Sequence, residues 1–160
     1  MAEFGTTSRQ RLNTTHPLIQ ELCQRVVAVF DITIICGHRT KPEQEAAYLA
    51  SASTKRWPSS KHNAIPSEAI DVAPWPLPND WGDLKSMFPQ ERDKAWKERV
   101  KFYQMVTAFK ICWQQLCDDF PEIGENFELR FGADWDGDND YRDQTFDDLV
   151  HIEIVEKTNG

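Results

Sequence analysis

The spacing of apolar residues divides the chain into helical and strand-like segments. Within residues 8–30, apolar residues recur at intervals of three and four, which predicts an amphipathic helix. We expect a break near His16 and Pro17, because the residue before a proline disfavours the helical conformation. A longer helical pattern covers residues 89–120, and we expect its apolar side to pack against a sheet. That side comprises Trp96, Val100, Tyr103, Val106, Phe109, Trp113, Leu116 and Phe120.

Short segments rich in β-branched and aromatic residues are the predicted strands. They are residues 31–36 (DITIIC), 68–73 (EAIDVA), 127–131 (FELRF) and 149–155 (LVHIEIV). After the first of them, Thr40 is placed to cap a helix that extends to about Ser51, with Pro42 and Glu43 in its first turn. Three prolines in residues 74–81 exclude regular structure there. The order of elements predicts a small α+β domain with helices packed on an antiparallel sheet.

Composition and charge narrow the class of protein. A chain of 160 residues with 40% apolar residues can form one globular domain, which we expect over residues 1–160. We expect its core to extend from about residue 8 to residue 156, with no separate binding domain. The sequence lacks an apolar run of about 18 residues, so we expect no stable membrane insertion. It starts without the pattern of a secretory signal, which predicts synthesis in the cytoplasm. The net charge of −8 argues against a nucleic-acid partner.

Two stretches, residues 60–71 (SKHNAIPSEAID) and 148–153 (DLVHIE), carry the candidate chemistry. A catalytic zinc site typically uses three histidine or carboxylate ligands and leaves a fourth position for water. His62, Asp71 and His151 can supply this set, if the predicted strands bring them to one edge of the sheet. On its own, His62 could equally be an ordinary polar loop residue.

Two acidic residues flank His151. Asp148 is the candidate general base that takes a proton from water and returns it to a leaving amine. It could also be one more acid of an acidic loop, like its neighbour Asp147. Glu153 lies on the same strand face as His151 and could orient that ligand, or form a surface ion pair.

Further polar residues have a functional and an ordinary interpretation. Arg39 follows a predicted strand and could hold a substrate carboxylate or a developing oxyanion, or be a solvated loop residue. Ser60 could donate a hydrogen bond to the substrate. In the acidic loop, Asp136, Asp138, Asp140 and Asp147 have the spacing of calcium ligands. A solvated turn is the alternative to calcium, because Tyr141 replaces the glycine of that motif and no helices are predicted to flank it.

Three segments together carry a resemblance to a known family. Residues 37–44 (GHRTKPEQ), 60–74 (SKHNAIPSEAIDVAP) and 131–153 (FGADWDGDNDYRDQTFDDLVHIE) resemble the zinc D-alanyl-D-alanine carboxypeptidases (VanY-like), and within them the phage endolysins that are L-alanyl-D-glutamate peptidases. The resemblance implies the fold of the hedgehog and D-Ala-D-Ala peptidases. It also implies roles for six residues: His62, Asp71 and His151 as zinc ligands, Asp148 as the base, and Arg39 and Ser60 on the substrate side.

One feature departs from the family pattern. Many members place the aspartate seven residues after the histidine, whereas nine residues separate His62 from Asp71, and Ser67 stands where the family has a glycine. A loop longer by two residues before the strand would absorb this difference and leave the ligand roles intact.

The resemblance implies a phage enzyme that uses one catalytic Zn²⁺ to hydrolyse the stem peptides of bacterial peptidoglycan. We expect a monomer, made in the host cytoplasm, that acts on the cell wall with a holin for its release. A D-alanyl-D-alanine carboxypeptidase, which trims the end of a stem peptide, is the alternative within the enzyme class. A non-catalytic zinc-binding or cell-wall-binding module is the alternative from another class, and the candidate base Asp148 argues against it.

Overall fold

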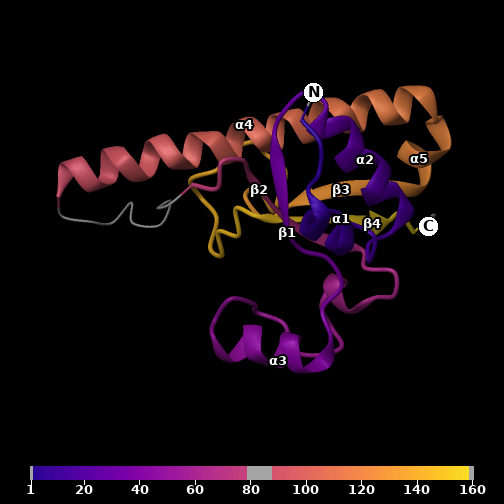
Figure 1. Ribbon diagram of the computed structural model, residues 1–160, viewed down its shortest axis with the longest axis horizontal. Coiled ribbons are helices and arrows are strands. Elements are labelled where there is room, and N and C mark those ends of the chain that lie inside the picture. The colour runs from indigo at the N-terminus through magenta and orange to yellow at the C-terminus, as the bar shows by residue number, and fades with distance from the viewer. Residues whose placement is uncertain (1, 79–87, 159–160) are drawn as a thin grey trace.

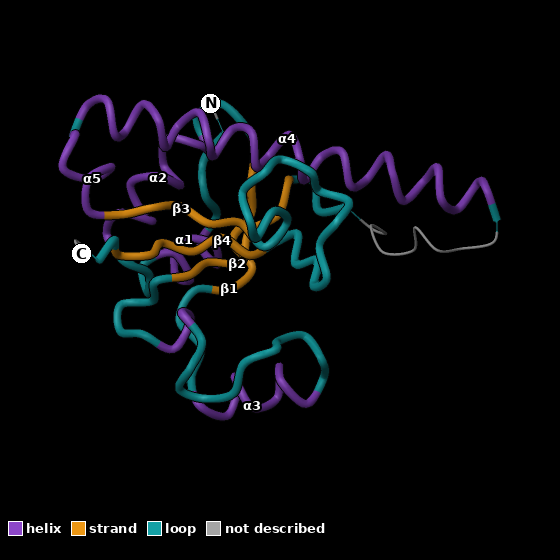
Figure 2. Tube along the Cα trace, turned by 180° about the vertical axis from the view of Figure 1, so that it is seen from behind, coloured by secondary structure: helices purple, strands orange, loops and turns teal. Residues whose placement is uncertain are grey.

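The computed structural model describes residues 2–78 and 88–158. In this part of the chain, an antiparallel four-stranded sheet has the strand order β1-β2-β4-β3 (Figures 1 and 2). The elements are α1 (Thr6–Leu12), α2 (Pro17–Val27), β1 (Ile32–Cys36), α3 (Lys41–Leu49), the 3-10 turn η1 (Lys61–Asn63), β2 (Ala69–Pro74), α4 (Pro89–Asp119), α5 (Pro121–Asn126), β3 (Phe127–Phe131) and β4 (His151–Glu156). The α+β class with an antiparallel sheet, predicted from the sequence, is confirmed.

The two faces of the sheet have different roles, because successive residues of a strand point to opposite sides. In β4, Ile152 and Ile154 are buried in the hydrophobic core, so His151 and Glu153 face the other side. Asp71 of β2 lies directly opposite His151 and shares its face. The core face packs on α2 and α4, through Leu22, Val26, Phe102, Phe109 and Leu116 among others. The helix α3 and the loop after it lie on the opposite side of the sheet (Figure 1).

Local signals position the helix starts. The predicted break separates α1 from α2, and the ring of His16 caps α2 by accepting a hydrogen bond from the backbone N–H of Leu18 at 3.2 Å. Thr40 caps α3, and the Glu43 carboxylate accepts a hydrogen bond from the Thr40 backbone N–H at 2.7 Å. The structure also contains α5, which the sequence pattern did not predict because six residues are too few to show a helical period.

The long helix α4 covers the sheet only with its C-terminal half. Val106, Phe109 and Leu116 are buried, as predicted, but Trp96 and Val100 are 41% and 44% exposed, and Phe120, at the C-cap of the helix, is 46% exposed. The prediction that the whole apolar side is packed was therefore wrong. A helix of 31 residues is about 46 Å long, whereas strands of five or six residues extend about 17–20 Å, so α4 extends beyond the sheet (Figure 1).

The irregular segment that the prolines predict begins one residue later than expected, after Pro74 instead of at it. Pro74 is the last residue of β2 and pairs with Ile32 of β1. The sheet tolerates Pro74 because the pairing of β2 with β4 ends before this residue. The missing N–H of the proline therefore removes no hydrogen bond between these strands. Residues 79–81 of this stretch lie outside the described residues. None of the described helices has the length and apolarity required to cross a membrane.

Gly132 allows a close approach between the end of β3 and the start of β4. Its N–H donates to the carbonyl of His151 at 2.8 Å, and its carbonyl accepts from the N–H of Asp148 at 3.0 Å. A Cβ at this position would overlap the carbonyl oxygen of Asp148 and lie 2.9 Å from the Asp148 Cβ. The two segments can lie this close only without a side chain at residue 132.

We predict that Gly132→Ala lowers the free energy of unfolding by about 1–3 kcal/mol, because the added methyl group forces these segments apart. Gly5→Ala is the matched control, since a Cβ at Gly5 would meet no atom within 4 Å, and its effect should stay within about 0.5 kcal/mol. Urea unfolding of both variants measures the difference. Equal midpoints for Gly132→Ala and the wild type would contradict the prediction.

Candidate active site

The fold brings together three predicted ligand residues. His62 lies on η1, Asp71 on β2 and His151 at the start of β4. His62 Nε2 is 3.1 Å from Asp71 Oδ1 and 3.2 Å from His151 Nδ1, and these last two atoms are 3.3 Å apart. All three residues are buried. One carboxylate oxygen and two imidazole nitrogens therefore face a common point, where they could hold a metal ion.

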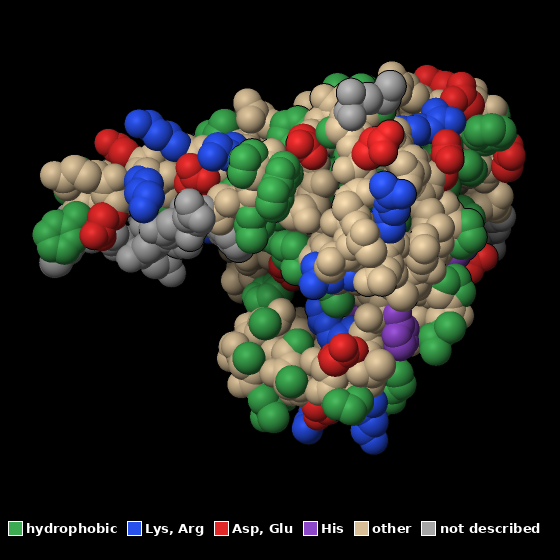
Figure 3. All heavy atoms as spheres, viewed as in Figure 1, with side chains coloured by type: hydrophobic (Ala, Val, Ile, Leu, Met, Phe, Trp, Pro, Cys, Tyr) green, Lys and Arg blue, Asp and Glu red, His purple; other side chains and the backbone are tan. Residues whose placement is uncertain are grey.

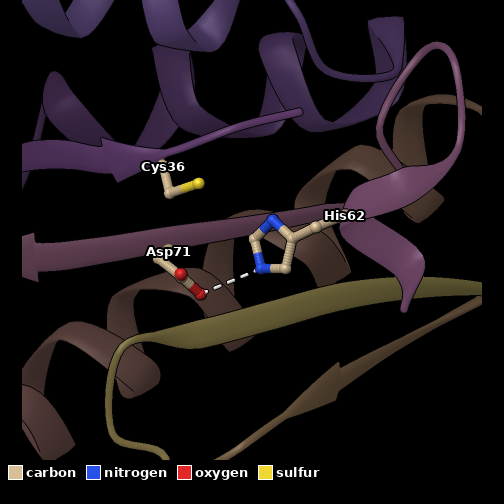
Figure 4. A group of neighbouring side chains, drawn as sticks. All are labelled: Cys36, His62 and Asp71. Atoms are coloured by element: carbon tan, nitrogen blue, oxygen red, sulfur yellow. Dashed lines mark hydrogen bonds and ion pairs between the residues drawn. The ribbon is translucent and has the colours of Figure 1, made fainter. Parts of the chain in front are cut away.

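Cys36 extends this group on the side of β1. The register of β1 shifts between Ile34 and Cys36, which sets Cys36 opposite Asp71. Ligand atoms of Cys36, His62 and Asp71 lie within 4.8 Å of one another and form a possible metal-binding group (Figure 4). Sequence reasoning did not single out Cys36, because only this strand register brings its sulfur to the site.

The hydrogen bonds of His62 define its protonation in the metal-free protein. Its Nδ1 lies 2.7 Å from the carbonyl oxygen of Gly37, which can only accept, so Nδ1 carries a proton. Its Nε2 faces the Asp71 carboxylate, which is also an acceptor. Burial lowers the pKa of His62, but the hydrogen bonds with Asp71 and Cys36 and the negative charge of Asp71 together outweigh this effect and raise the pKa to about 10. The imidazole is therefore doubly protonated at neutral pH.

The other oxygen of Asp71 is held by Arg39. Arg39 Nη2 lies 2.9 Å from Asp71 Oδ2, and Nη1 donates to Gln44 Oε1 at 3.1 Å. Burial raises the pKa of Asp71, but its contacts with His151 and His62 outweigh that effect and hold the pKa well below its usual range. The Asp71 carboxylate is therefore ionised and held in place by contacts on both oxygens.

Gln44 is a buried residue of α3 that connects Arg39 to the loop after that helix. Besides accepting from Arg39, it donates through Nε2 to Ser53 Oγ at 3.0 Å and to the carbonyl of Lys55 at 2.6 Å. A glutamine in a predicted surface helix gives no signal of burial, so sequence reasoning missed it. Gln44 therefore fixes the position of residues 53–55 relative to the site.

Ser60 and Glu153 contact the two histidine-bearing segments. The Ser60 hydroxyl accepts from the backbone N–H of His62 at 3.3 Å and so caps η1. Glu153 Oε2 lies 3.0 Å from His151 Nε2. The other ring nitrogen, His151 Nδ1, therefore faces the same point as His62 Nε2 and Asp71 Oδ1. The contact with Glu153 is the orienting contact that a histidine ligand commonly makes with a carboxylate.

Asp148 is half-buried and lies in the turn before β4, where its carbonyl accepts from the His151 N–H at 3.1 Å. Burial, and next the negative charge of Asp71, raise the pKa of Asp148 to about 6. A carboxyl group with a pKa near neutrality suits general acid–base chemistry. Asp148 is therefore the residue of the site best suited to accept and return a proton.

A cleft of about 390 Å³ opens beside these residues. One wall is the loop after α3 together with residues 59–61, and the other comes from β3, β4 and the acidic loop between them. Figure 3 shows the hollow between the α3 lobe and the rest of the molecule, with basic side chains in it. The lining residues are Arg39, Ala52, Ser53, Thr54, Lys55, Ser59, Ser60, Lys61, Arg130, Trp135, Phe146, Asp148, His151, Glu153 and Val155.

The longer loop between the predicted ligands His62 and Asp71 packs on the turn between α1 and α2. The Ser67 N–H donates to the carbonyl of Thr14 at 3.0 Å, and the His16 N–H donates to the carbonyl of Ser67 at 2.8 Å. Ser67, near the end of the loop, is buried and anchored there, whereas Ile65 and Pro66 before it are exposed. The nine-residue interval is thus compatible with the convergence of His62 and Asp71.

The acidic loop does not assemble the four predicted calcium positions into one group among the described residues. Asp140 pairs with Arg142 at 2.8 Å, and Asp147 pairs with Arg99. Asp136 and Asp138 instead lie near Asp134, as a second group of acidic ligand atoms within 4.8 Å of one another. The buried Asp134 carboxylate is paired with Lys110 Nζ at 3.0 Å.

Comparison with known proteins finds a matching family, a relative in sequence and a solved structure of the same fold. The profile of the family described as phage L-alanyl-D-glutamate peptidase matches residues 1–102. An L-alanyl-D-glutamate peptidase of Escherichia phage T5 is 30% identical over 160 residues, which cover 96% of this chain and 98% of that protein. The crystal structure of the Serratia marcescens L-Ala D-Glu endopeptidase ChiX has the same fold, with a TM-score of 0.59, 16% identity, and coverage of 95% of this chain and 89% of that chain.

We predict that binding of a divalent metal ion at pH 7 releases at least one proton per ion. The ion must replace the proton on His62 Nε2, which the raised pKa of about 10 keeps in place in the metal-free protein. Calorimetric titration in buffers of different ionisation enthalpy measures this release. The same apparent binding enthalpy in all buffers would show that no proton leaves and would contradict the prediction.

Proposed function

The chain belongs to the family of phage L-alanyl-D-glutamate peptidases, and from this premise we propose that it uses one zinc ion to hydrolyse the L-alanyl-D-glutamate bond in peptidoglycan stem peptides. The substrate places its action at the bacterial cell wall. The convergence of one aspartate and two histidines beside an open cleft, with a carboxyl group of raised pKa, is the observation that carries this proposal.

The spacing of the ligand atoms supports zinc. Zinc binds nitrogen and oxygen ligands at about 2.0–2.1 Å in tetrahedral geometry, which separates the ligand atoms by about 3.3 Å. The separations between His62, Asp71 and His151 are 3.1–3.3 Å. We prefer His151 to Cys36 as the third ligand, because the atoms of His62, Asp71 and His151 have these short separations, whereas Cys36 joins His62 and Asp71 in a group whose atoms lie within 4.8 Å of one another. Bound zinc would supply Lewis acidity and an open coordination position for water.

The surrounding residues have separate roles in the proposal. Asp148 accepts a proton from the attacking water and returns it to the leaving amine of the D-glutamate. Arg39 holds Asp71 in its ligand orientation, and Glu153 holds His151 with Nδ1 toward the metal. Arg39 also lines the cleft, but its guanidinium is already engaged with Asp71 and Gln44. We therefore assign it mainly to positioning the ligand.

We predict that digestion of purified peptidoglycan exposes new amino termini on D-glutamate and releases no free D-alanine. The reason is that the scissile bond precedes the D-glutamate, whereas a D-alanyl-D-alanine carboxypeptidase would cut at the end of the stem. Mass spectrometry of the digest after amino-terminal labelling distinguishes the two products. Free D-alanine without labelled D-glutamate would replace the proposed function with the carboxypeptidase activity.

We predict that Asp148→Asn retains zinc but loses about 10²- to 10⁴-fold in hydrolysis rate, because the amide cannot accept the proton. His62→Ala is the matched variant, and it should lose both zinc and activity because it removes a ligand. Metal analysis and the release of labelled termini measure both quantities. Activity retained in Asp148→Asn would remove that residue from the role of base, and a normal zinc content in His62→Ala would remove that histidine from the ligand set.

A further inference from the structure

The chemistry of the proposed substrate poses a requirement for the cleft. A D-glutamate whose amine forms the scissile bond has two carboxyl groups, and the stem peptide continues through one of them. The other carboxyl group stays free, a few bonds from the scissile nitrogen. Enclosing this carboxylate without a partner would be costly, so a cation in the cleft wall is expected.

Among the described residues, the cleft is lined by the basic side chains of Arg39, Lys55, Lys61 and Arg130. The Arg39 side chain is only 13% exposed and is held between Asp71 and Gln44. Lys61 is paired with Glu68. Lys55 is an exposed residue of the loop on the wall opposite the sheet. Arg130 is the basic residue that the sheet itself places next to the ligand His151.

Cross-strand pairing positions Arg130. It lies on β3 directly opposite Glu153 of β4, and its Nη1 is 3.4 Å from Glu153 Oε1. That distance is longer than the 2.7–2.9 Å of a charge-assisted hydrogen bond, and the arginine side chain is 41% exposed. Glu153 uses its other oxygen for His151. The guanidinium is thus close to the metal ligands and still open to the cleft.

Trp135 supports this placement. The Arg130 guanidinium lies over the Trp135 ring at 5.8 Å, and the same ring lies 5.4 Å from the ring of His151. The indole N–H of Trp135 is bonded to the carbonyl of Phe146 at 2.7 Å, which fixes the ring. An arginine held on an aromatic face keeps its planar fork of donors in a defined orientation, which suits two-point binding of a carboxylate.

We propose that Arg130 binds the free carboxylate of the D-glutamate next to the scissile bond and thereby selects an acidic residue at that position. This inference rests on the proposed function and deepens it. Arg130 contacts substrate in this role. Its present neighbours, Glu153 and Trp135, hold it ready without saturating its donors.

The test compares two synthetic stem peptides that differ only at this group, one with the free carboxylate and one with the primary amide of the same shape. We expect the wild-type enzyme to cleave the carboxylate peptide with a kcat/KM about 10- to 100-fold higher. In Arg130→Met this preference should disappear, through loss on the carboxylate peptide alone. Arg25→Met, which removes an arginine paired with Asp119 far from the cleft, should leave both rates unchanged.

The outcomes separate the possible failures. If Arg130→Met, with its zinc content intact, loses the same factor on both peptides, Arg130 acts only through Glu153 and His151, and the inference is overturned. If the wild type cleaves both peptides equally, the inference is overturned but the proposed function stands. Wild-type enzyme that cleaves neither overturns both. If Arg130→Met does not fold, Arg130→Lys decides: a several-fold smaller preference with the amide rate maintained supports the inference, and an unchanged preference contradicts it.

Discussion

The buried carboxylate of Asp71 is the contact on which the rest of the site depends. A charge in this position is stable only when both oxygens are paired, and the fold pairs them with different parts of the chain. One oxygen faces His62 and His151, and the other binds Arg39. Arg39 in turn contacts Gln44, which binds the loop at residues 53–55. A single chain of polar contacts thus connects the centre of the sheet to the opposite wall of the cleft.

The same contacts bear on how the proposed metal ion would compete with protons for the site. Without a metal ion, the two ring N–H groups of His62 face the Gly37 carbonyl oxygen and the Asp71 carboxylate. The positive charge of the imidazolium and the negative charge of Asp71 offset one another. An ion with ligand separations near 3.3 Å can take the place of a proton without rearrangement of the strands. Metal ions and protons therefore compete for the same nitrogen atoms. Because the histidines lose their protons as the pH rises, the affinity for metal should increase with pH.

Much of this arrangement could be predicted from the sequence, and the exceptions have a common cause. The composition of residues 149–155 indicated a strand, and its period of two placed His151 and Glu153 on one face. The spacing around His62 and Asp148 indicated the candidate ligands and base. Each of these patterns is local.

The residues that were missed depend on contacts between distant segments. Cys36 reaches the site through an irregular strand register, Gln44 is buried by a loop that folds over it, and Arg130 meets Glu153 only because β3 pairs with β4. The exposed half of α4 has the same origin, since helical periodicity indicates an apolar side but not the length of the sheet beneath it. Register and extent are set by tertiary structure, which a local pattern does not contain.

Two neighbouring carboxyl groups of the site, Asp71 and Asp148, have pKa values shifted in opposite directions by their surroundings. The histidines lower the pKa of Asp71 despite its burial, whereas burial and the charge of Asp71 raise the pKa of Asp148. When two acids share a site, the one held ionised suits a constant electrostatic task, and the one near neutrality suits proton transfer. The positive charge of a bound ion would lower both pKa values. The environments of the two groups therefore support the proposal that Asp71 is a metal ligand and Asp148 the base, as their motifs also predict.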